Sequence, residues 1–394
     1  MECSTSVAVG SEGMASIIII INATEIGGAI GRNRFKTKDE TMNKIWKRTD
    51  EQTFCIANAL EYEDEVIEII DRHWKNAGDE ERKDFSQFLF LDWDKQEDTL
   101  VKILTEIFPG PEVSPKSSFV PLKNEIYELI KMNTDPDFRS EVLLREAEVN
   151  RSDIDQKVQK LTANEKKPVL ECVKEISEKK NIKKEETLKA LQSKLNKKRG
   201  EALQERAIQH FEIKNKTKVK QTKRMFQKDV EYEGVKWKIQ GKIDGDFVKE
   251  NKVIEVKNRT GTRYHCDDHE RIQLQTYMFL CEKQQGLFLE RLNGRQKETL
   301  FKFHEQDWKE NVIPPLKEFV AKLIGMIETY RELVEDNMKY YVNFATTTTT
   351  TTAIAAEPPC KRPSDSSTNS DVKEKNSRIE DEEQDSETLE FLSQ

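Results

Sequence analysis

The stretch GKIDGDFVKENKVIEVKNR, residues 241–259, constrains the fold of this chain more than any other. Apolar and polar residues alternate on both sides of KENK, which is typical of two strands joined by a tight turn. A turn whose corners are the glutamate and asparagine of KENK places Asp246 opposite Glu255 and Asp244 opposite Lys257. The sequence therefore predicts an antiparallel hairpin that carries several charges.

Side chains alternate along a strand, so these four charged residues are expected on one face of the hairpin. The other face is expected to be apolar, with Ile243, Phe247, Ile254 and Val256. Like charges opposite one another destabilise a sheet, and a divalent cation removes the repulsion. Carboxylates suit Mg²⁺ or Mn²⁺, so we predict that Asp244 and Glu255 hold the metal. Lys257 would lie beside it and position an attacking water.

The rest of the chain predicts a mixed α/β protein. Apolar residues recur at helical spacing from about 51 to 196 and again in GEALQERAIQHFE. The expected elements after that are strands within 219–258, a helix at 268–283, strands within 286–303 and a helix at 305–338. Glycines 27, 28 and 31 are expected to let a helix approach another backbone closely.

The charge of the chain is distributed unevenly. Of the formal net charge of −8, residues 357–394 contribute −6, with 11 acids and 5 bases. Residues 174–228 instead hold 18 Lys and Arg against 7 Asp and Glu. This excess favours a polyanionic partner, with Lys197, Lys198 and Arg199 as candidate DNA contacts. A solvated helical face is the alternative interpretation.

The cysteines and the N-terminus bear on the compartment. The 6 cysteines form no CxxC pair, which favours a reducing compartment, nuclear or cytoplasmic. The run SIIIIINATE is too short for a signal peptide or a membrane span. His265, Cys266 and His269 suggest a zinc site but lack an evident fourth ligand, so a loop that touches DNA or solvent is preferred.

Two motifs resemble a known family. GKID followed by IEVK resembles the D…(D/E)xK signature of the PD-(D/E)XK nuclease superfamily, with Asp244, Glu255 and Lys257 at its core positions. RIQLQTYMFL resembles the QxxxY helix of the RecB-like and phage lambda exonuclease-like branches, with Gln273 and Tyr277 at the matching positions. The resemblance implies catalytic roles for all five residues, and the carbonyl of Val256 as a further metal ligand.

Two further segments narrow the branch. NATEIGGAIGRNRFK is similar to the segment that opens the lambda exonuclease and YqaJ-like viral recombinase group, where it helps to bind the DNA end. Arg32 and Arg34 could hold a terminal phosphate there, or be ordinary surface residues. KRGEALQERAIQHFE resembles the first core helix, which brings an acid to the metal. This chain has Gln204 where the acid is expected, so the second metal would bind weakly or be held by Glu205.

The resemblance implies an α/β fold with the restriction-endonuclease-like αβββαβ core and a large, mainly helical insertion. The expected organisation begins with a loose leader at 1–15 and an N-terminal segment of the nuclease domain at 16–48. The helical insertion follows at 49–196, the nuclease core with its terminal helix at 197–340, and a disordered acidic tail at 341–394.

The implied function is metal-dependent hydrolysis of DNA phosphodiester bonds, as an exonuclease in recombination, repair or replication. The expected partners are duplex or single-stranded DNA ends, with no membrane. Endonuclease action, an RNA substrate, a catalytically inactive DNA-binding scaffold, a homo-oligomer and partnership with recombination or replication proteins stay open at this point.

Overall fold

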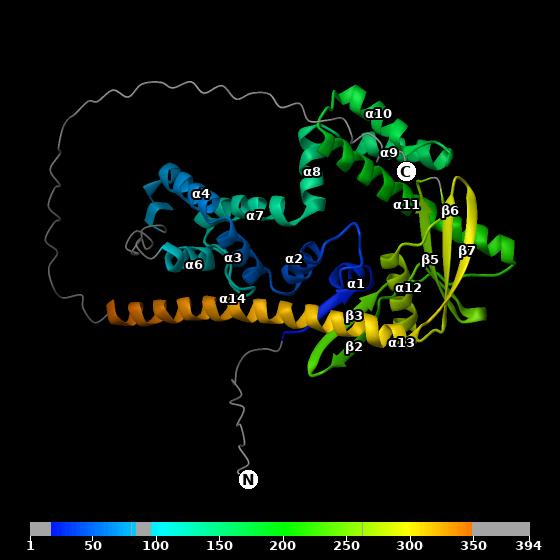
Figure 1. The fold of residues 1–394 in the computed structure, drawn as a ribbon. Coiled ribbons are helices and arrows are strands. Elements are labelled where there is room, and N and C mark those ends of the chain that lie inside the picture. Colours follow the sequence, from blue (N-terminus) through cyan, green and yellow to red (C-terminus); the bar gives the residue numbers. More distant parts are fainter. Residues whose placement is uncertain (1–16, 80, 84–95, 262, 349–394) are drawn as a thin grey trace, which may run out of the picture. The chain divides into compact units, whose positions relative to one another are not determined.

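The computed structural model describes residues 17–79, 81–83, 96–261 and 263–348 (Figure 1). The expected leader at 1–15 lies outside these residues. So does the expected tail after 348, although residues 341–348 belong to a helix and not to the tail. Within the described residues, no helix is long and apolar enough to cross a membrane.

The N-terminal half is almost entirely helical after one strand. Its elements are β1 Ile19–Asn22, α1 Ala23–Ala29, α2 Lys38–Thr49, α3 Glu51–Glu61, α4 Glu63–Asn76, α6 Gln96–Ile107, the 3₁₀ turn Ser117–Phe119, α7 Val120–Thr134, α8 Pro136–Glu146, α9 Arg151–Ala163, α10 Val169–Lys180 and α11 Glu185–Asn215.

The remaining half carries most of the strands. Its elements are β2 Phe226–Tyr232, β3 Val235–Gly241, β4 Gly245–Phe247, the 3₁₀ turn Val248–Glu250, β5 Lys252–Arg259, α12 Asp268–Cys281, β6 Gln285–Leu292, β7 Arg295–Lys302, α13 Glu305–Asp307, a π-helix Trp308–Val312 and α14 Ile313–Thr348.

The strands form two small sheets, in the orders β1-β3-β2 and β4-β5-β6-β7 (Figure 1). β1 runs parallel to β3, and β5 runs parallel to β6, with α12 as the connection between the two parallel strands. The predicted mixed α/β arrangement is confirmed. Between α11 and α12 the chain forms four strands, β2 to β5, where the resemblance implied three.

The isoleucine run forms β1 because it enters the sheet beside β3, where Ile19 and Ile21 are fully buried. α1 follows at once and packs against α12. A Cβ on Gly27 would come within 2.8 Å of the Cβ of His269, and one on Gly28 within 2.2 Å of Thr41 Oγ1. The predicted close approach to another backbone is therefore confirmed at Gly27, which fixes the N-terminal segment on α12, whereas Gly28 and Gly31 meet only the side chains of Thr41 and Lys38.

The helical region does not form a separate body. α3, α4, α6 and α7 contribute Phe54, Ile70, Leu104 and Ile126, respectively, to the same core as the first sheet and α14. α8, α9, α10 and the first half of α11 have a second core of their own, around Cys172 and Leu191. The predicted boundary at residue 196 falls inside α11, which continues from that second core into a third.

The register of the hairpin differs from the predicted one. The observed pairs are Gly245 with Ile254, Asp246 with Val253 and Phe247 with Lys252. The predicted pairing was wrong because the connection is a 3₁₀ turn that ends in a left-handed Asn251, and not a two-residue corner. Asp244, one residue beyond the last pair, is therefore next in register to Glu255 rather than to Lys257.

The predicted faces of the hairpin are right only in part. Phe247, Ile254 and Val256 pack together against the second half of α11, as expected for an apolar face. Ile243 instead joins the main core with Val253. The Asp246 carboxylate forms an ion pair with Lys283 at 2.5 Å, so it does not belong with Asp244, Glu255 and Lys257 as predicted.

Candidate active site

Asp244 lies in the short segment between β3 and β4. Its Oδ2 accepts a hydrogen bond from the backbone N–H of Val256 at 2.8 Å, and its Oδ1 accepts one from Gln204 Nε2 at 2.7 Å. Burial, followed by the charge of Glu255, raises the pKa of Asp244 to about 8. The two carboxylates thus repel one another in a place where water does not screen them.

Glu255 lies in the middle of β5 and is 3% exposed. Its Oε1 is 2.8 Å from Lys257 Nζ and accepts a hydrogen bond from Gln273 Nε2 at 3.0 Å. Its Oε2 is buried and has no hydrogen-bond partner among the described residues. One oxygen of a buried carboxylate is therefore left for a ligand.

Gln273 and Tyr277 lie one turn apart on α12 and face this carboxylate. The amide oxygen of Gln273 accepts from Lys257 Nζ at 3.1 Å, and its amide nitrogen also approaches the Tyr277 hydroxyl at 2.9 Å. Burial and the Glu255 charge raise the pKa of Tyr277, so its phenol stays neutral. The pKa of Lys257 is raised as well, because the attraction of Glu255 outweighs burial, which lowers it.

The structure therefore brings together all five residues that the two motifs contain. We call Asp244, Glu255, Lys257, Gln273 and Tyr277 the hairpin site. Two carboxylates share one lysine in it, so its acids are not fully neutralised by protein groups.

α11 presents Gln204 to this site and turns Glu205 away. Gln204 donates to Asp244, whereas Glu205 is exposed and accepts from Gln209 at 3.2 Å, one turn further along the helix. The helix is anchored to β5 by Asn258, which donates to the Gly200 carbonyl at 2.8 Å. The alternative in which Glu205 holds a metal is thus corrected, because its side chain leaves the helix on the solvent side.

The basic residues of α11 differ in exposure. Lys197 and Lys198 lie near the carboxylates of Asp137 and Asp155, at 3.9 Å and 2.7 Å. Arg199 is 3% exposed, and it donates to the backbone carbonyls of Arg259 and Glu165. The predicted DNA contact by Arg199 is wrong, because its guanidinium is used to hold helix, strand and loop together.

Arg32 and Arg34 lie in the loop between α1 and α2 and point to the N-terminus of α12. Arg34 Nη2 is 3.1 Å from the carboxylate of Asp267, and Arg32 Nε is 3.9 Å from that of Asp268. Both arginines are partly exposed, so acidic partners orient them without burying them.

The zinc interpretation gains no support from the loop before α12. Asp267, His269 and Glu270 lie close enough to share an ion, whereas Cys266 belongs to no such group within the described residues. Glu270 is engaged elsewhere, because it caps α12 and binds Arg259 through both carboxylate oxygens, at 2.7 and 2.8 Å. This group is thus part of the structural support of α12.

Sequence reasoning missed that support. Arg259, two residues after Lys257, also donates to Glu290 on β6 at 3.0 Å and to the carbonyl of His265. It joins β5, β6 and α12 behind the hairpin site. The signal that could have indicated this support of α12 is the arginine of EVKNR, a charged residue at the end of a strand expected to be largely buried.

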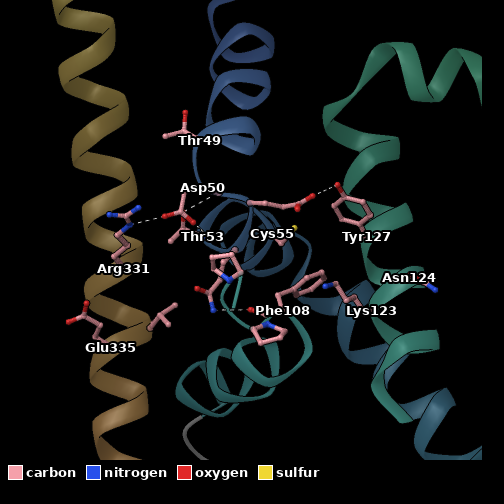
Figure 2. Close-up of a pocket in the computed structure, with 15 residues that line it drawn as sticks. Thr49, Asp50, Thr53, Cys55, Phe108, Lys123, Asn124, Tyr127, Arg331 and Glu335 are labelled. Atoms are coloured by element: carbon pink, nitrogen blue, oxygen red, sulfur yellow. Dashed lines mark hydrogen bonds and ion pairs between the residues drawn. The ribbon is translucent and has the colours of Figure 1, made fainter. Parts of the chain in front are cut away.

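A separate cavity of about 710 Å³ lies among α3, α7 and α14 (Figure 2). Several of its polar groups already have partners. Arg331 binds the Asp50 carboxylate at 2.7 Å, the Tyr127 hydroxyl donates to Glu51, and Gln52 donates to the Phe108 carbonyl. None of the five residues of the hairpin site lines it.

No protein-family model and no curated protein matches this chain. Solved structures with local similarity include an alkaline exonuclease, LHK-Exo, from Laribacter hongkongensis, at 17% identity and a TM-score of 0.30, over 36% of this chain and 75% of that one. A phage related exonuclease from Haemophilus somnus 129PT matches at 14% identity and a TM-score of 0.24, over 36% and 73%.

The protein SSO0001 matches at 16% identity and a TM-score of 0.26, over 36% of this chain and 64% of that one, less than two thirds of its length.

Proposed function

We propose that this chain is a metal-dependent nuclease of the PD-(D/E)XK type that hydrolyses DNA phosphodiester bonds, and that it acts from a DNA end. The observation that supports this proposal best is the composition of the hairpin site. A buried pair of carboxylates with one shared lysine and an unpartnered Glu255 oxygen is costly to the fold unless the site binds a cation.

The donor set fits Mg²⁺ or Mn²⁺. Asp244 and Glu255 offer hard oxygen ligands, and no cysteine or histidine is among the five residues of the site. The Val256 carbonyl is a third candidate ligand, since it lies between Glu255 and Lys257 on β5. Such a cation, when bound, would supply charge stabilisation for the phosphate and lower the pKa of a water molecule.

The chain's own residues would orient the reaction. Lys257 is held between Glu255 and Gln273, and from there its ammonium can donate to a water or to a phosphate oxygen. Gln273 fixes both Lys257 and Glu255, and the Tyr277 phenol supports Gln273 from the next turn. Asp244 is fixed through both of its oxygens by Val256 and Gln204.

One observation favours a second candidate, a DNA-binding scaffold without turnover. The Gln204 amide already donates to Asp244 Oδ1 and brings no charge of its own. A site with this amide holds one carboxylate fewer than a site with an acid on α11. The affinity of the hairpin site for a divalent cation therefore distinguishes the nuclease from the DNA-binding scaffold.

The experiment that tests the proposal is digestion of a 5′-phosphorylated linear duplex and a covalently closed circle, with Mg²⁺, Mn²⁺ or chelator. We expect metal-dependent loss of the linear duplex, and loss of activity in Lys257→Ala. Cutting of the circle would mean endonuclease action. Binding of DNA without cleavage under any metal would leave the scaffold, and cleavage of RNA alone would change the substrate class.

A further inference from the structure

The loop between α1 and α2 holds an aromatic ring out of the protein. Phe35 is 65% exposed, although it lies within a loop that is well fixed by hydrogen bonds. Its backbone N–H donates to Asn33 Oδ1 at 2.9 Å, the N–H of Arg32 donates to the Gly27 carbonyl at 2.7 Å, and Thr37 caps α2. The exposure of the ring is therefore a property of an ordered turn.

Two side chains organise the ring. The guanidinium of Arg34 lies over it, 4.6 Å from its centroid, and the His269 ring meets it edge to face at 5.6 Å. Arg34 is in turn fixed by Asp267 at 3.1 Å. Because Arg34 covers one face of the ring, a nucleic-acid base would stack on the opposite face, with the cation behind the ring.

The Phe35 ring contacts the same helix, α12, that carries Gln273 and Tyr277 of the hairpin site. His269 precedes Gln273 by one turn and Tyr277 by two turns of α12, so all three share one face of the helix. One turn corresponds to about 6 Å along the helix axis. The contact between Gly27 and His269 holds the loop at this end of α12. The ring thus contacts His269 one turn before Gln273, which accepts a hydrogen bond from Lys257.

A cavity of about 490 Å³ opens beside the ring. Phe35, Lys36, Lys44 and Lys47 line it from the N-terminal segment, and residues 134–137 line it from the corner between α7 and α8. Its volume is in the range that accepts a nucleoside. Four acidic side chains, those of Glu25, Glu40, Asp135 and Asp137, line it against the three lysines, and Glu25 is engaged by Arg48 at 3.0 Å and by Lys44 at 3.3 Å.

We propose that Phe35, with Arg34 over it, is a stacking platform for a base of the DNA strand whose phosphate enters the hairpin site. This inference rests on the proposed function and names a contact by which that site would engage its substrate. The ring supplies stacking that tolerates any base, and Arg34 adds a positive charge near the backbone. Loss of the ring is expected to weaken DNA binding on the order of tenfold.

The test uses the full chain with linear duplexes that carry 2-aminopurine at each of the first four nucleotides of the 5′-phosphorylated strand, in Ca²⁺. Stacking on the ring quenches the fluorescence of the labelled base. The variants are Phe35→Leu, which keeps an apolar side chain without a π face, and Phe35→Trp, which keeps the π face. Leu170→Ala on α10 is the matched control, because Leu170 is also an exposed apolar residue.

We expect quenching at one label position in the wild type, its loss with about tenfold weaker binding in Phe35→Leu, its return in Phe35→Trp, and no change in Leu170→Ala. Unchanged quenching in Phe35→Leu would overturn the platform. So would a change in molecular mass by light scattering without a change in quenching, which would make the ring a contact between copies of the chain.

The outcome separates the platform from the proposed function. If quenching depends on Phe35 but the protein cleaves no DNA with any metal, the stacking platform is supported and the proposed nuclease activity is contradicted. Cleavage by a Phe35→Leu variant that binds and quenches as the wild type does would remove only the platform.

Discussion

Two clusters of acids and lysines in this protein have opposite electrostatics. In the helical region, Asp153 and Glu175 are each engaged by more than one lysine, a group we call the α9–α10 cluster. The pKa of Asp153 is lowered, first by its hydrogen bond to Lys179, and that of Glu175 is lowered to about 2 by Lys157 and Lys167. In the hairpin site the pKa of Asp244 is raised to about 8 by burial and by Glu255.

The two clusters differ in the number of lysines that pair with each carboxylate. The α9–α10 cluster has at least two lysines for each carboxylate, so even Asp153, which is 8% exposed, is compensated by protein charges, and the cluster is a structural feature of the helical region. The hairpin site has one lysine for two acids and an unpartnered Glu255 oxygen. A deficit of compensating charge, rather than charge itself, distinguishes a candidate site from a solvated ion-pair group.

The largest expected effect comes from the matched pair Glu255→Gln and Glu175→Gln. Glu255→Gln removes a proposed metal ligand, and we expect DNA cleavage to fall roughly 100-fold or more. Glu175→Gln, in the α9–α10 cluster, should leave cleavage within about twofold. Initial rates on a labelled linear duplex at saturating Mg²⁺ measure both. Equal losses in the two variants would contradict the distinction between the clusters.

The next comparison concerns stability without metal. At pH 9, where Asp244 is largely ionised because its pKa is about 8, Asp244→Asn removes the repulsion between two buried carboxylates, so the melting temperature in chelator should rise by roughly 2–4 °C. Asp153→Asn removes a carboxylate that lysines stabilise, so it should lower the melting temperature slightly. Scanning calorimetry in chelator measures both signs. A lower melting temperature for Asp244→Asn would show that its hydrogen bonds to Val256 and Gln204 outweigh the repulsion.

The two clusters also predict opposite responses to pH in chelator. The pKa of Asp244 is about 8 in the folded protein and about 3.9 in the unfolded chain, so its contribution is present in full below about pH 4 and is lost as the pH rises through 8. The pKa of Asp153 is lowered on folding, so its contribution is lost as the pH falls below its unfolded value.

Between pH 5 and 9 the melting temperature of the wild type should therefore fall more steeply than that of Asp244→Asn. Thermal unfolding across this range, read by intrinsic fluorescence, provides the measurement. Parallel curves for the two proteins would mean that Asp244 is already ionised at pH 5.

A smaller effect is expected on α11. Gln204→Glu adds a third carboxylate beside Asp244, and we expect Mn²⁺ affinity to increase about tenfold by titration calorimetry, with lower stability in chelator. Glu205→Gln, at the next position, should change neither quantity because that side chain faces solvent. Unchanged Mn²⁺ affinity in Gln204→Glu would show that α11 does not reach the metal position.

The strands of residues 241–259, the helix that follows them and the residue types of the hairpin site could be predicted from the sequence, whereas β1 and the fourth strand before α12 could not. Alternation along residues 241–259 indicated the strands, and the spacing of Gln273 and Tyr277 placed both on one face of a helix. These features are local, since the period of a strand or a helix fixes which side chains share a face. For that reason they could be predicted without knowing what the elements pack against.

Long-range packing selected the charges that belong to the hairpin site. The left-handed Asn251 set the register, the ion pair with Lys283 removed Asp246, and the angle of α11 turned Gln204 inward and Glu205 outward. Arg199 was buried and Phe35 was left exposed by contacts with segments distant in the sequence. Each of these outcomes depends on long-range packing, which local periodicity does not encode.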